Sequence, residues 1–580
     1  MKLPKLVQNA QSRDLTDTFL GYNHRLKINP GEFYWTENLT TRDYPMLSTR
    51  RRRGMVRRLT KPQGLLAKDK LCYVDNGTLY YGDNATPVSG LSDGHKQLVS
   101  MGAYVCIFPD KVFFNTVDPT DYGSMEFSRT ITGDVSYALC SVTGADIIYT
   151  TAASAPSDPV NGDYWYDTND KLLKIYSASQ EEWVTMATVY TRISFAGLGF
   201  AMTDYFKVYD GLSISGTAYP DVLDGNHTLY AVGADYIVIV GLLDATTIST
   251  NSGTNASVKL SREVPDLDYV CECQNRLWGC YYGMKDGQML NEIYCCALGD
   301  FKNWHSYMGI STDSWAASVG SDGPWTGAIN YLGYPTFFKE DRIHRVTVSS
   351  VGAHTLIETP ARGVQNGSAG SLAIVNEILF YKSRADVVAY QGGFPEGVSA
   401  ALGDENYSEA VGGTFGMFYF ISMKDSANKR HLFVYDSSNR LWIREDDLQL
   451  TDIVRMEDSL YAQAADGVLW DLAGAVGEKE TRLPWAAQTG ILYYQTPDRK
   501  YTSRYDIMIA AQAGTKVEVY IQYDSNGIWR FSGAMTFKGI NTITFPVRPR
   551  RCNHMELRIQ GEGDVKIYNI ARILEQGSDT

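Results

Sequence analysis

The sequence of 580 residues lacks a long hydrophobic run. Its longest apolar stretch, residues 236–243 (YIVIVGLL), is far shorter than the about 20 residues that a membrane-spanning helix needs. Residues 1–26 contain no apolar core of the kind found in signal peptides. We therefore expect a soluble protein that is made in the cytoplasm and does not insert into a membrane.

Common catalytic motifs are also missing. The sequence has no phosphate-binding Walker loop, no HExxH pair and no GxGxxG ahead of a helix, and its eight histidines are scattered without metal-ligand spacing. A glycosidase pair such as Asp167 with Glu182 stays open because carboxylates are plentiful, but nothing distinguishes it. The sequence predicts that the chain is not an enzyme and binds no metal or cofactor.

Positive charge is in short supply. The chain has 53 lysines and arginines against 66 aspartates and glutamates, which gives a formal net charge of −13. Phosphate groups are bound mainly by Lys and Arg, so this balance argues against a general nucleic-acid binder. An acidic wall can still line a passage through which DNA moves without adhering.

Convincing amphipathic helices are absent, and short strand-forming runs take their place. Asp or Asn followed by a small apolar run recurs along the chain, a pattern typical of tight β-hairpin turns. Examples are residues 69–74 (DKLCYV), 76–81 (NGTLYY), 376–381 (NEILFY) and 439–444 (NRLWIR). Between about residues 265 and 475 the copies recur at spacings of several tens of residues, close to the length of a four-stranded propeller blade. The sequence therefore predicts an all-β protein built around an irregular β-propeller of about five to seven blades.

Changes of pattern divide the chain further. The later strands are longer and alternate apolar with polar side chains, which indicates a β-sandwich of jelly-roll type. The predicted segments are an N-terminal arm (1–59), the first part of the propeller (60–140), a small inserted β module (141–192), an inserted small β-barrel (193–262), the remainder of the propeller (263–477) and the C-terminal sandwich (478–580).

Five of the nine cysteines lie close together in the sequence, at positions 271, 273, 280, 295 and 296. Zinc sites favour paired C-x₂₋₄-C units, and these spacings do not place all five around one tetrahedron. Disulfides are rare in a reducing compartment. We interpret the cysteines as small apolar side chains packed between blades, with zinc and disulfides as alternatives.

Arginine is concentrated in one block of this acidic chain. We expect so dense a block to contact an acidic neighbouring subunit or DNA phosphate. A solvated loop is the alternative. The candidate contact residues are Arg50, Arg51, Arg52, Arg53, Arg57 and Arg58.

Aromatic residues in the small inserted module offer a weak glycan contact. Tyr164, Trp165 and Trp183 could stack on sugar rings. So small a module also needs its aromatic residues for its own core, and we favour that interpretation.

Several stretches resemble a known family. Residues 264–280 (VPDLDYVCECQNRLWGC), 291–307 (NEIYCCALGDFKNWHSY), 419–446 and 528–579 are similar to tailed-phage virion proteins described as packaged-DNA stabilization or tail-nozzle (tail hub) β-propeller proteins. The resemblance covers most of the chain, and the segment 141–262 matches only loosely.

This resemblance implies a structural protein of the phage tail. Such a protein would form a homo-oligomeric ring, a hexamer, that extends the DNA conduit below the portal and adaptor proteins, retains packaged double-stranded DNA without sequence specificity and anchors tail fibres. Its location would be the virion. The alternative is a receptor- or glycan-binding tail protein.

Overall fold

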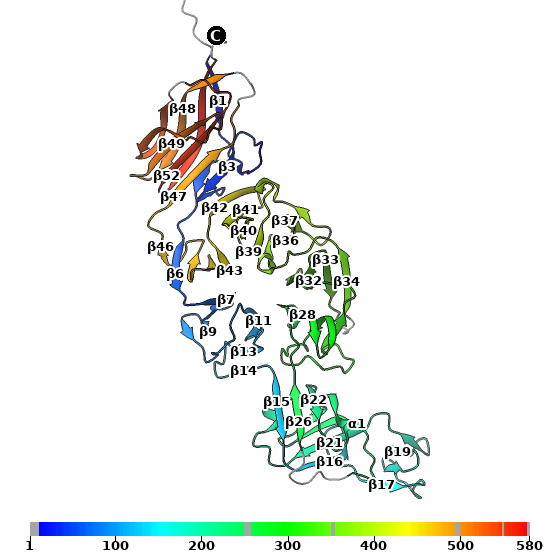
Figure 1. Cartoon of the computed structure of the whole chain (residues 1–580). Helices are drawn as coiled ribbons and strands as arrows, with labels where there is room; N and C mark the ends of the chain where they lie inside the picture. The colour runs from blue at the N-terminus through cyan, green and yellow to red at the C-terminus, as the bar shows by residue number, and fades with distance from the viewer. Residues whose placement is uncertain (1–10, 249–256, 350–353, 494–498, 548–549, 577–580) are drawn as a thin grey trace, which may run out of the picture.

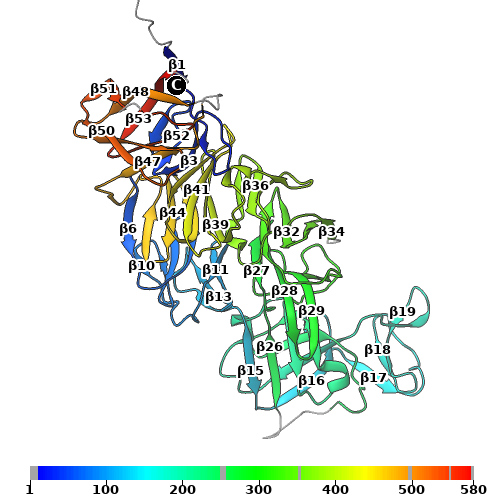
Figure 2. The same ribbon diagram turned by 45° about the horizontal axis from the view of Figure 1, so that its top comes forward.

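The structure is a computed structural model, and it describes residues 11–248, 257–349, 354–493, 499–547 and 550–576. The first ten residues, on which part of the signal-peptide argument depends, lie outside this range. The fold is all-β, as predicted. Figures 1 and 2 show a sandwich at one end of the molecule, a propeller in the middle and an insertion at the other end.

The propeller contains seven sheets within the described residues. Blades 1 to 4 consist of β7 (Pro62–Ala67), β8 (Leu71–Asp75), β9 (Thr78–Tyr81) and β10 (Asn84–Ala85); β11 (Gln97–Met101), β12 (Tyr104–Phe108), β13 (Val112–Asn115) and β14 (Tyr122–Ser124); β27 (Tyr269–Glu272), β28 (Leu277–Lys285), β29 (Gln288–Cys295) and β30 (Trp315–Ser318); and β31 (Gly327–Tyr331), β32 (Tyr334–Lys339), β33 (Arg342–Thr347) and β34 (Thr355–Pro360).

Blades 5 to 7 complete the ring. They consist of β35 (Ala373–Val375), β36 (Ile378–Lys382), β37 (Val387–Tyr390) and β38 (Glu396–Gly397); β39 (Ser408–Phe415), β40 (Phe418–Lys424), β41 (Arg430–Asp436) and β42 (Leu441–Asp446); and β43 (Leu450–Met456), β44 (Ser459–Ala464) and β45 (Val468–Asp471) with β6 (Gly54–Arg58) and β46 (Glu478–Lys479). The first strand of each blade contacts the next blade, and β43 contacts β7, so the ring closes.

Blade 7 is assembled from both ends of the propeller segment. Strand β6 pairs antiparallel with β45, from Val468 opposite Arg58 to Asp471 opposite Gly54. We predicted that the propeller begins at residue 60, whereas the structure adds residues 54–58 to its last blade. This pairing ties the two ends of the propeller segment together within one sheet.

The sandwich also uses both ends of the chain. One sheet contains β4 (Leu39–Thr40), β5 (Leu47–Thr49), β53 (Val565–Gln576), β48 (Lys500–Ala511) and β51 (Gly539–Pro546), with β1 (Gln11–Thr16) paired to β53. The other sheet contains β2 (Gly21–Tyr22), β3 (Glu32–Glu37), β47 (Pro484–Thr489), β52 (Met555–Glu562), β49 (Lys516–Tyr523) and β50 (Arg530–Thr536).

The predicted N-terminal arm is therefore part of the sandwich and not a separate segment. Phe33, Leu39 and Leu47 are buried in one core with Ile507 and Leu557. Burying these side chains is favourable by roughly 1.5–3 kcal/mol for each one, which explains why the segment docks.

The insertion leaves the propeller after β14 and returns before β27. Its sheets contain β15 (Phe127–Ile131), β26 (Val258–Arg262), β22 (Gly211–Ser215) and β23 (Gly225–Thr228); β16 (Val135–Cys140), β21 (Tyr190–Phe195), β25 (Tyr236–Val240) and β24 (Ala231–Val232); and β17 (Tyr149–Ala152), β18 (Tyr164–Asp167), β19 (Leu172–Ser177) and β20 (Glu182–Thr185). Short helical turns are α1 (Pro220–Leu223), η1 (Met202–Asp204), η2 (Ala369–Ser371) and η3 (Ala400–Leu402).

The insertion starts earlier than the predicted boundary at residue 141. Strand β15 pairs with β26 and β16 pairs with β21, so residues from Phe127 onward complete sheets whose other strands come much later in the sequence. Strands β17–β20 form a separate small sheet. Within the described ranges, no helix is both long and apolar enough to cross a bilayer.

Candidate functional site

Two arginines of the predicted block are buried where the propeller meets the sandwich. Arg53 is 3% exposed. Its Nη2 donates to Glu445 Oε2 (2.7 Å) and its Nη1 to Asp446 Oδ2 (2.6 Å), both at the end of β42. Arg50 donates from Nη1 to Glu480 Oε2 (2.7 Å). Buried guanidinium groups require such partners, because an uncompensated buried charge is strongly destabilising.

Glu480 lies between β46 and β47, in the segment that carries the chain from the propeller into the sandwich. Its Oε2 also accepts the backbone N–H of Arg53 (2.8 Å). Burial by itself raises the pKa of Glu480, but the hydrogen bond and charge of Arg50 outweigh burial and hold this pKa below its usual range. The ionised carboxylate therefore joins the incoming and outgoing connections between the two modules.

Two further arginines contact nearby parts of the same chain. Arg57 contacts the Tyr73 hydroxyl and Asp83 of blade 1. Arg52 donates from Nη1 to the backbone carbonyl of Thr481 (2.7 Å). These contacts orient the arginines within the chain.

Only part of the predicted block remains on the surface. Arg51 and Arg58 are exposed, whereas Arg50 and Arg53 are not. The structure thus differs from the surface contact that we predicted, because blade 6 and the segment after β46 supply the acidic partners that we expected from a neighbour.

A groove of about 690 Å³ lies between blade 7 and the sandwich. Arg51, Arg52, Lys479 and Lys566 contribute to its walls, and Arg52 Nε lies 3.6 Å from Asp564 Oδ1. Over the described ranges, Arg51 forms no ion pair of its own. Of the exposed arginines in the predicted block, Arg51 lies in this groove and Arg58 lies outside it.

The aromatic residues of the small sheet pack against one another. Trp165 is 6% exposed and donates from its indole N–H to the Ala152 carbonyl (2.9 Å). Its ring centroid lies 5.5 Å from that of Trp183, and Lys174 Nζ lies 4.8 Å from its centroid. Tyr164 is half-buried and packs against the core of the insertion. The faces of Trp165 are therefore occupied by the protein itself.

The carboxylates left open as a glycosidase pair are separated. Asp167 lies opposite Leu172 and Glu182 opposite Ser177, at the two ends of β19. Five residues of strand span about 16 Å, beyond the 5–9.5 Å that glycosidase carboxyl pairs span. Asp167 instead forms an ion pair with Lys174 (2.8 Å).

The cysteines fill the interfaces of blade 3. Cys271, Cys273, Cys280 and Cys295 pack with other buried side chains between blades 3 and 4, and Cys296 packs on the opposite side toward blade 2. All nine cysteines are buried and unpaired. Burial raises the pKa of Cys273 and Cys295 to about 12. Among the described residues, no group of three or more His, Cys, Asp or Glu side chains is arranged to hold a metal ion.

One serine motif went unnoticed in the sequence. Residues 90–94 (GLSDG) match the GxSxG pattern, whose serine lies on a strand-to-helix turn in α/β-hydrolases. Here Ser92 lies in the loop between β10 and β11, and its hydroxyl accepts a hydrogen bond from Lys96 Nζ (2.6 Å). Lys96 is paired with Asp110 (2.7 Å), and Asp110 Oδ1 accepts the backbone N–H of Ser92 (2.6 Å), so Ser92, Lys96 and Asp110 form one hydrogen-bonded cluster.

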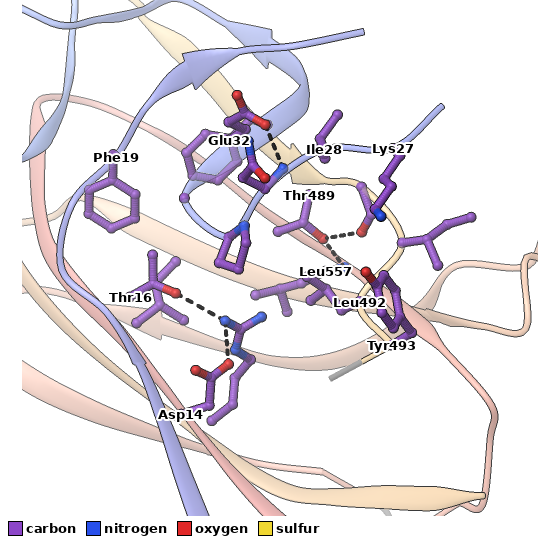
Figure 3. Close-up of a pocket in the computed structure, with 18 of the residues that line it drawn as sticks. Asp14, Thr16, Phe19, Lys27, Ile28, Glu32, Thr489, Leu492, Tyr493 and Leu557 are labelled. Carbon is purple, nitrogen blue, oxygen red and sulfur yellow. Dashed lines mark hydrogen bonds and ion pairs between the residues drawn. The ribbon is translucent and has the colours of Figure 1, made fainter. Parts of the chain in front are cut away.

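A cavity of about 540 Å³ opens in the sandwich (Figure 3). Its walls include Asp14 and Thr16 of β1, the loop between β2 and β3, and residues 490–493 after β47. Arg572 of β53 also lines the cavity and donates from Nη2 to Thr16 Oγ1 (3.0 Å). The sequence analysis missed this cavity, and the one available signal was the single charge of Arg572 within the run IYNIARIL at 567–574.

Comparison with known proteins gives no family. No protein-family model matches the sequence, and no curated protein matches it. Among solved structures, an exo-β-1,3-galactanase from Phanerochaete chrysosporium is 9% identical and covers 52% of this chain and 95% of its own, with a TM-score of 0.22. A puromycin hydrolase is 10% identical over 64% of this chain and 58% of its own, with a TM-score of 0.16. A glycoside hydrolase is 10% identical over 52% of this chain and 96% of its own, with a TM-score of 0.13.

These matches correct one expectation. The sequence predicted that the chain is not an enzyme, and all three of these solved structures are enzymes by name. That prediction is contradicted and is withdrawn. The identities and TM-scores are too low to transfer an activity or a catalytic residue to this chain.

Proposed function

We propose that the chain is a structural subunit of a phage tail, where copies assemble into a ring that extends the DNA conduit, retains packaged DNA and anchors fibres. The resemblance of residues 264–280, 291–307, 419–446 and 528–579 to tail-nozzle proteins suggests this role. These stretches coincide with blade 3, blade 6 and the sandwich, which form the framework of the molecule.

The observation that carries the proposal is the way the two modules are joined. N-terminal strands complete both the sandwich and blade 7, and the ion pairs of Arg50 and Arg53 are buried between the connecting segments. A subunit held in this way resists bending between its modules. Such resistance suits a ring that must keep its bore open around DNA.

Charge supports the conduit role. A net charge of −13 disfavours lasting contact with DNA phosphates, so DNA could slide past the subunits. The exposed basic groove with Arg51 offers a contact for an acidic surface of the next subunit, as a head-to-tail ring requires.

The test is the mass and symmetry of the assembled chain. Purified full-length protein, mixed with portal and adaptor proteins, should give rings of about six copies in electron micrographs and by mass photometry. The double variant Arg51→Glu/Arg52→Glu should weaken assembly, and Arg58→Glu is the matched control on an arginine outside the groove. A chain that stays monomeric with these partners and is absent from virions would refute the proposal.

The second candidate is a receptor- or glycan-binding tail protein, and the cavity in the sandwich favours it (Figure 3). Trimers that bind cell-wall polysaccharide, in place of rings bound to the portal, would support this alternative.

A further inference from the structure

The cavity in the sandwich has the size and the enclosure of a small-ligand site. Its volume of about 540 Å³ falls within the roughly 300–1,000 Å³ that such pockets occupy. Figure 3 shows Asp14 and Thr16 on one side and Lys27 and Tyr493 on the other, with Leu557 between them.

One wall presents a neutral pair of charged groups. Arg572 is buried, and its Nη2 lies 2.6 Å from Asp14 Oδ2. The Asp14 side chain is 42% exposed, so its carboxylate can also accept hydrogen bonds from a ligand. A donor and an acceptor placed side by side match two neighbouring hydroxyl groups, each of which can donate and accept.

The opposite wall offers an aromatic ring and an ammonium group. Tyr493 is 43% exposed, and Lys27 is exposed. In the part of the chain that the structure describes, neither polar end is engaged by another side chain. The ring of Tyr493 can cover an apolar ligand face while its hydroxyl group forms a hydrogen bond.

The floor of the cavity is apolar. Phe19, Phe33, Leu557 and Ile570 are buried beneath it, and the rings of Phe19 and Phe33 stack with centroids 5.8 Å apart. A ligand that fits must therefore combine an apolar face with a polar edge.

The charges of the lining balance. The lining contains two carboxylates, Asp14 and Glu32, and two cations, Lys27 and Arg572. Asp14 is paired with Arg572, and Glu32 accepts the backbone N–H of Asn29. This balance disfavours phosphate and other strong anions, which need an excess of basic groups. Pyranose rings carry hydroxyl groups at their edge and C–H groups on their faces, which is the combination required here.

We propose that this cavity binds a neutral sugar residue of a polysaccharide, with its hydroxyl groups on Asp14 and Arg572 and its apolar face on Tyr493. The site lies at the opposite end of the molecule from the small sheet with Trp165 (Figure 1). The proposal does not depend on ring formation, because the lining residues that carry it all belong to one chain.

Titration calorimetry on the full-length chain tests the site with glucose, galactose and N-acetylglucosamine as neutral probes and with glucuronate and inorganic phosphate as anionic ones. Binding of at least one neutral sugar is expected. Tyr493→Ala should weaken that binding about tenfold or more, whereas Tyr493→Phe should retain most of it. Tyr122→Ala, on an exposed tyrosine of β14 in the propeller, is the matched control and should leave binding unchanged.

Asp14→Asn provides a second variant, because truncating the buried Arg572 could disturb the sandwich. It keeps one acceptor but removes the charge that faces the buried Arg572, so neutral-sugar binding should fall several-fold and the melting temperature should also fall. Binding is therefore measured well below the melting transition of the variant. Binding of anions alone, equal binding by Tyr493→Ala, or no heat with any neutral sugar at tens of millimolar would overturn the proposal. Ring assembly, measured in parallel, tests the proposed structural role separately, because its result does not depend on whether the cavity binds a sugar.

Discussion

Arg53 shows how a charged side chain can hold two modules together. It is nearly inaccessible to solvent, and its two carboxylate partners belong to a strand almost four hundred residues later in the chain. Arg53→Ala would leave the neighbouring carboxylates of Glu445 and Asp446 with less positive charge to balance them. We expect a loss of about 3–5 kcal/mol in the free energy of unfolding, measured by denaturant titration.

Arg58→Ala is the matched control for Arg53→Ala, because Arg58 lies at the end of β6, the strand that follows Arg53, and is exposed. Its effect should stay within about 0.5 kcal/mol. Equal effects of the two substitutions would contradict the role assigned to the buried network.

Asp210 makes the seam between the insertion and blade 3 sensitive to pH. It is 3% exposed, and burial together with the charge of Asp300 raises its pKa to about 6. A carboxyl group whose pKa is higher in the folded chain than in the unfolded one stabilises the fold in its protonated form. Its contribution is therefore fully present below the unfolded pKa of about 3.9 and is lost as the pH rises through about 6.

Asp210→Asn should remove this pH dependence, because the amide cannot ionise. Relative to wild type, the variant should gain about 2–3 kcal/mol at pH 7.5 and little at pH 4, from melting curves across this range. The groups facing Asp210 include Lys207, Arg262 and Asp300. Asp204→Asn, on an exposed residue nearby, is the control. An identical pH profile for wild type and Asp210→Asn would contradict the assignment.

Closure of the propeller depends on a strand that passes very close to another segment. A Cβ atom at Gly54 in β6 would lie 1.7 Å from the carbonyl oxygen of Val476. Gly54→Ala must therefore displace β6 or the turn before β46, at a cost of about 3 kcal/mol. Thermal melting and limited proteolysis near residue 54 would measure the effect.

Gly320→Ala is a suitable comparison, because no heavy atom lies within 4 Å of a Cβ built there. It should leave the melting temperature almost unchanged. If Gly54→Ala were equally well tolerated, β6 would not be the strand that closes the ring.

Local elements could be predicted from the sequence, and distant pairings could not. The turn at Asn76 and Gly77 has both residues at positive φ between Asp75 and Thr78, as a two-residue hairpin requires, and the motif predicted it. The pairing of β6 with β45 joins segments about four hundred residues apart, and no local pattern identifies such partners. The domain limits at residues 60, 141 and 478 differ from the structure for this reason.

The candidate sites also depend on contacts between distant parts of the chain, which the sequence does not reveal. The arginine block was visible as a run in the sequence, but its partners Glu445, Asp446 and Glu480 were not, so the expected neighbour turned out to be the same chain. The cavity around Arg572 draws residues from both ends of the chain, and only the fold brings them together.

At the scale of the whole molecule, the insertion is the part that can be removed. Phe127 lies opposite Arg262 where β15 and β26 leave the propeller, so the two ends of the insertion are adjacent. Replacing residues 127–262 with a short Gly-Ser linker should leave the propeller and the sandwich folded, as judged by circular dichroism and a single-copy mass measurement.

Deletion of residues 11–53 provides the opposite case. It removes β1–β5 from the sandwich and the approach to β6, so the shortened chain should aggregate or lose its cooperative melting transition. A deletion of 11–53 that melts like the full chain would contradict the interlocked arrangement.

Strand β6 pairs with β45, and β1 pairs with β53, which is the last strand of the described chain. Each early strand therefore has no partner until the later strand has been synthesised. During translation, the propeller cannot be completed until β45 and β46 have left the ribosome, and the sandwich cannot be completed until β53 has. The insertion, whose sheets use only residues 127–262, can fold long before then. The nascent chain is therefore expected to carry a folded insertion while the propeller and the sandwich are still incomplete. We expect chaperones to protect these two incomplete modules from aggregation until their last strands are made.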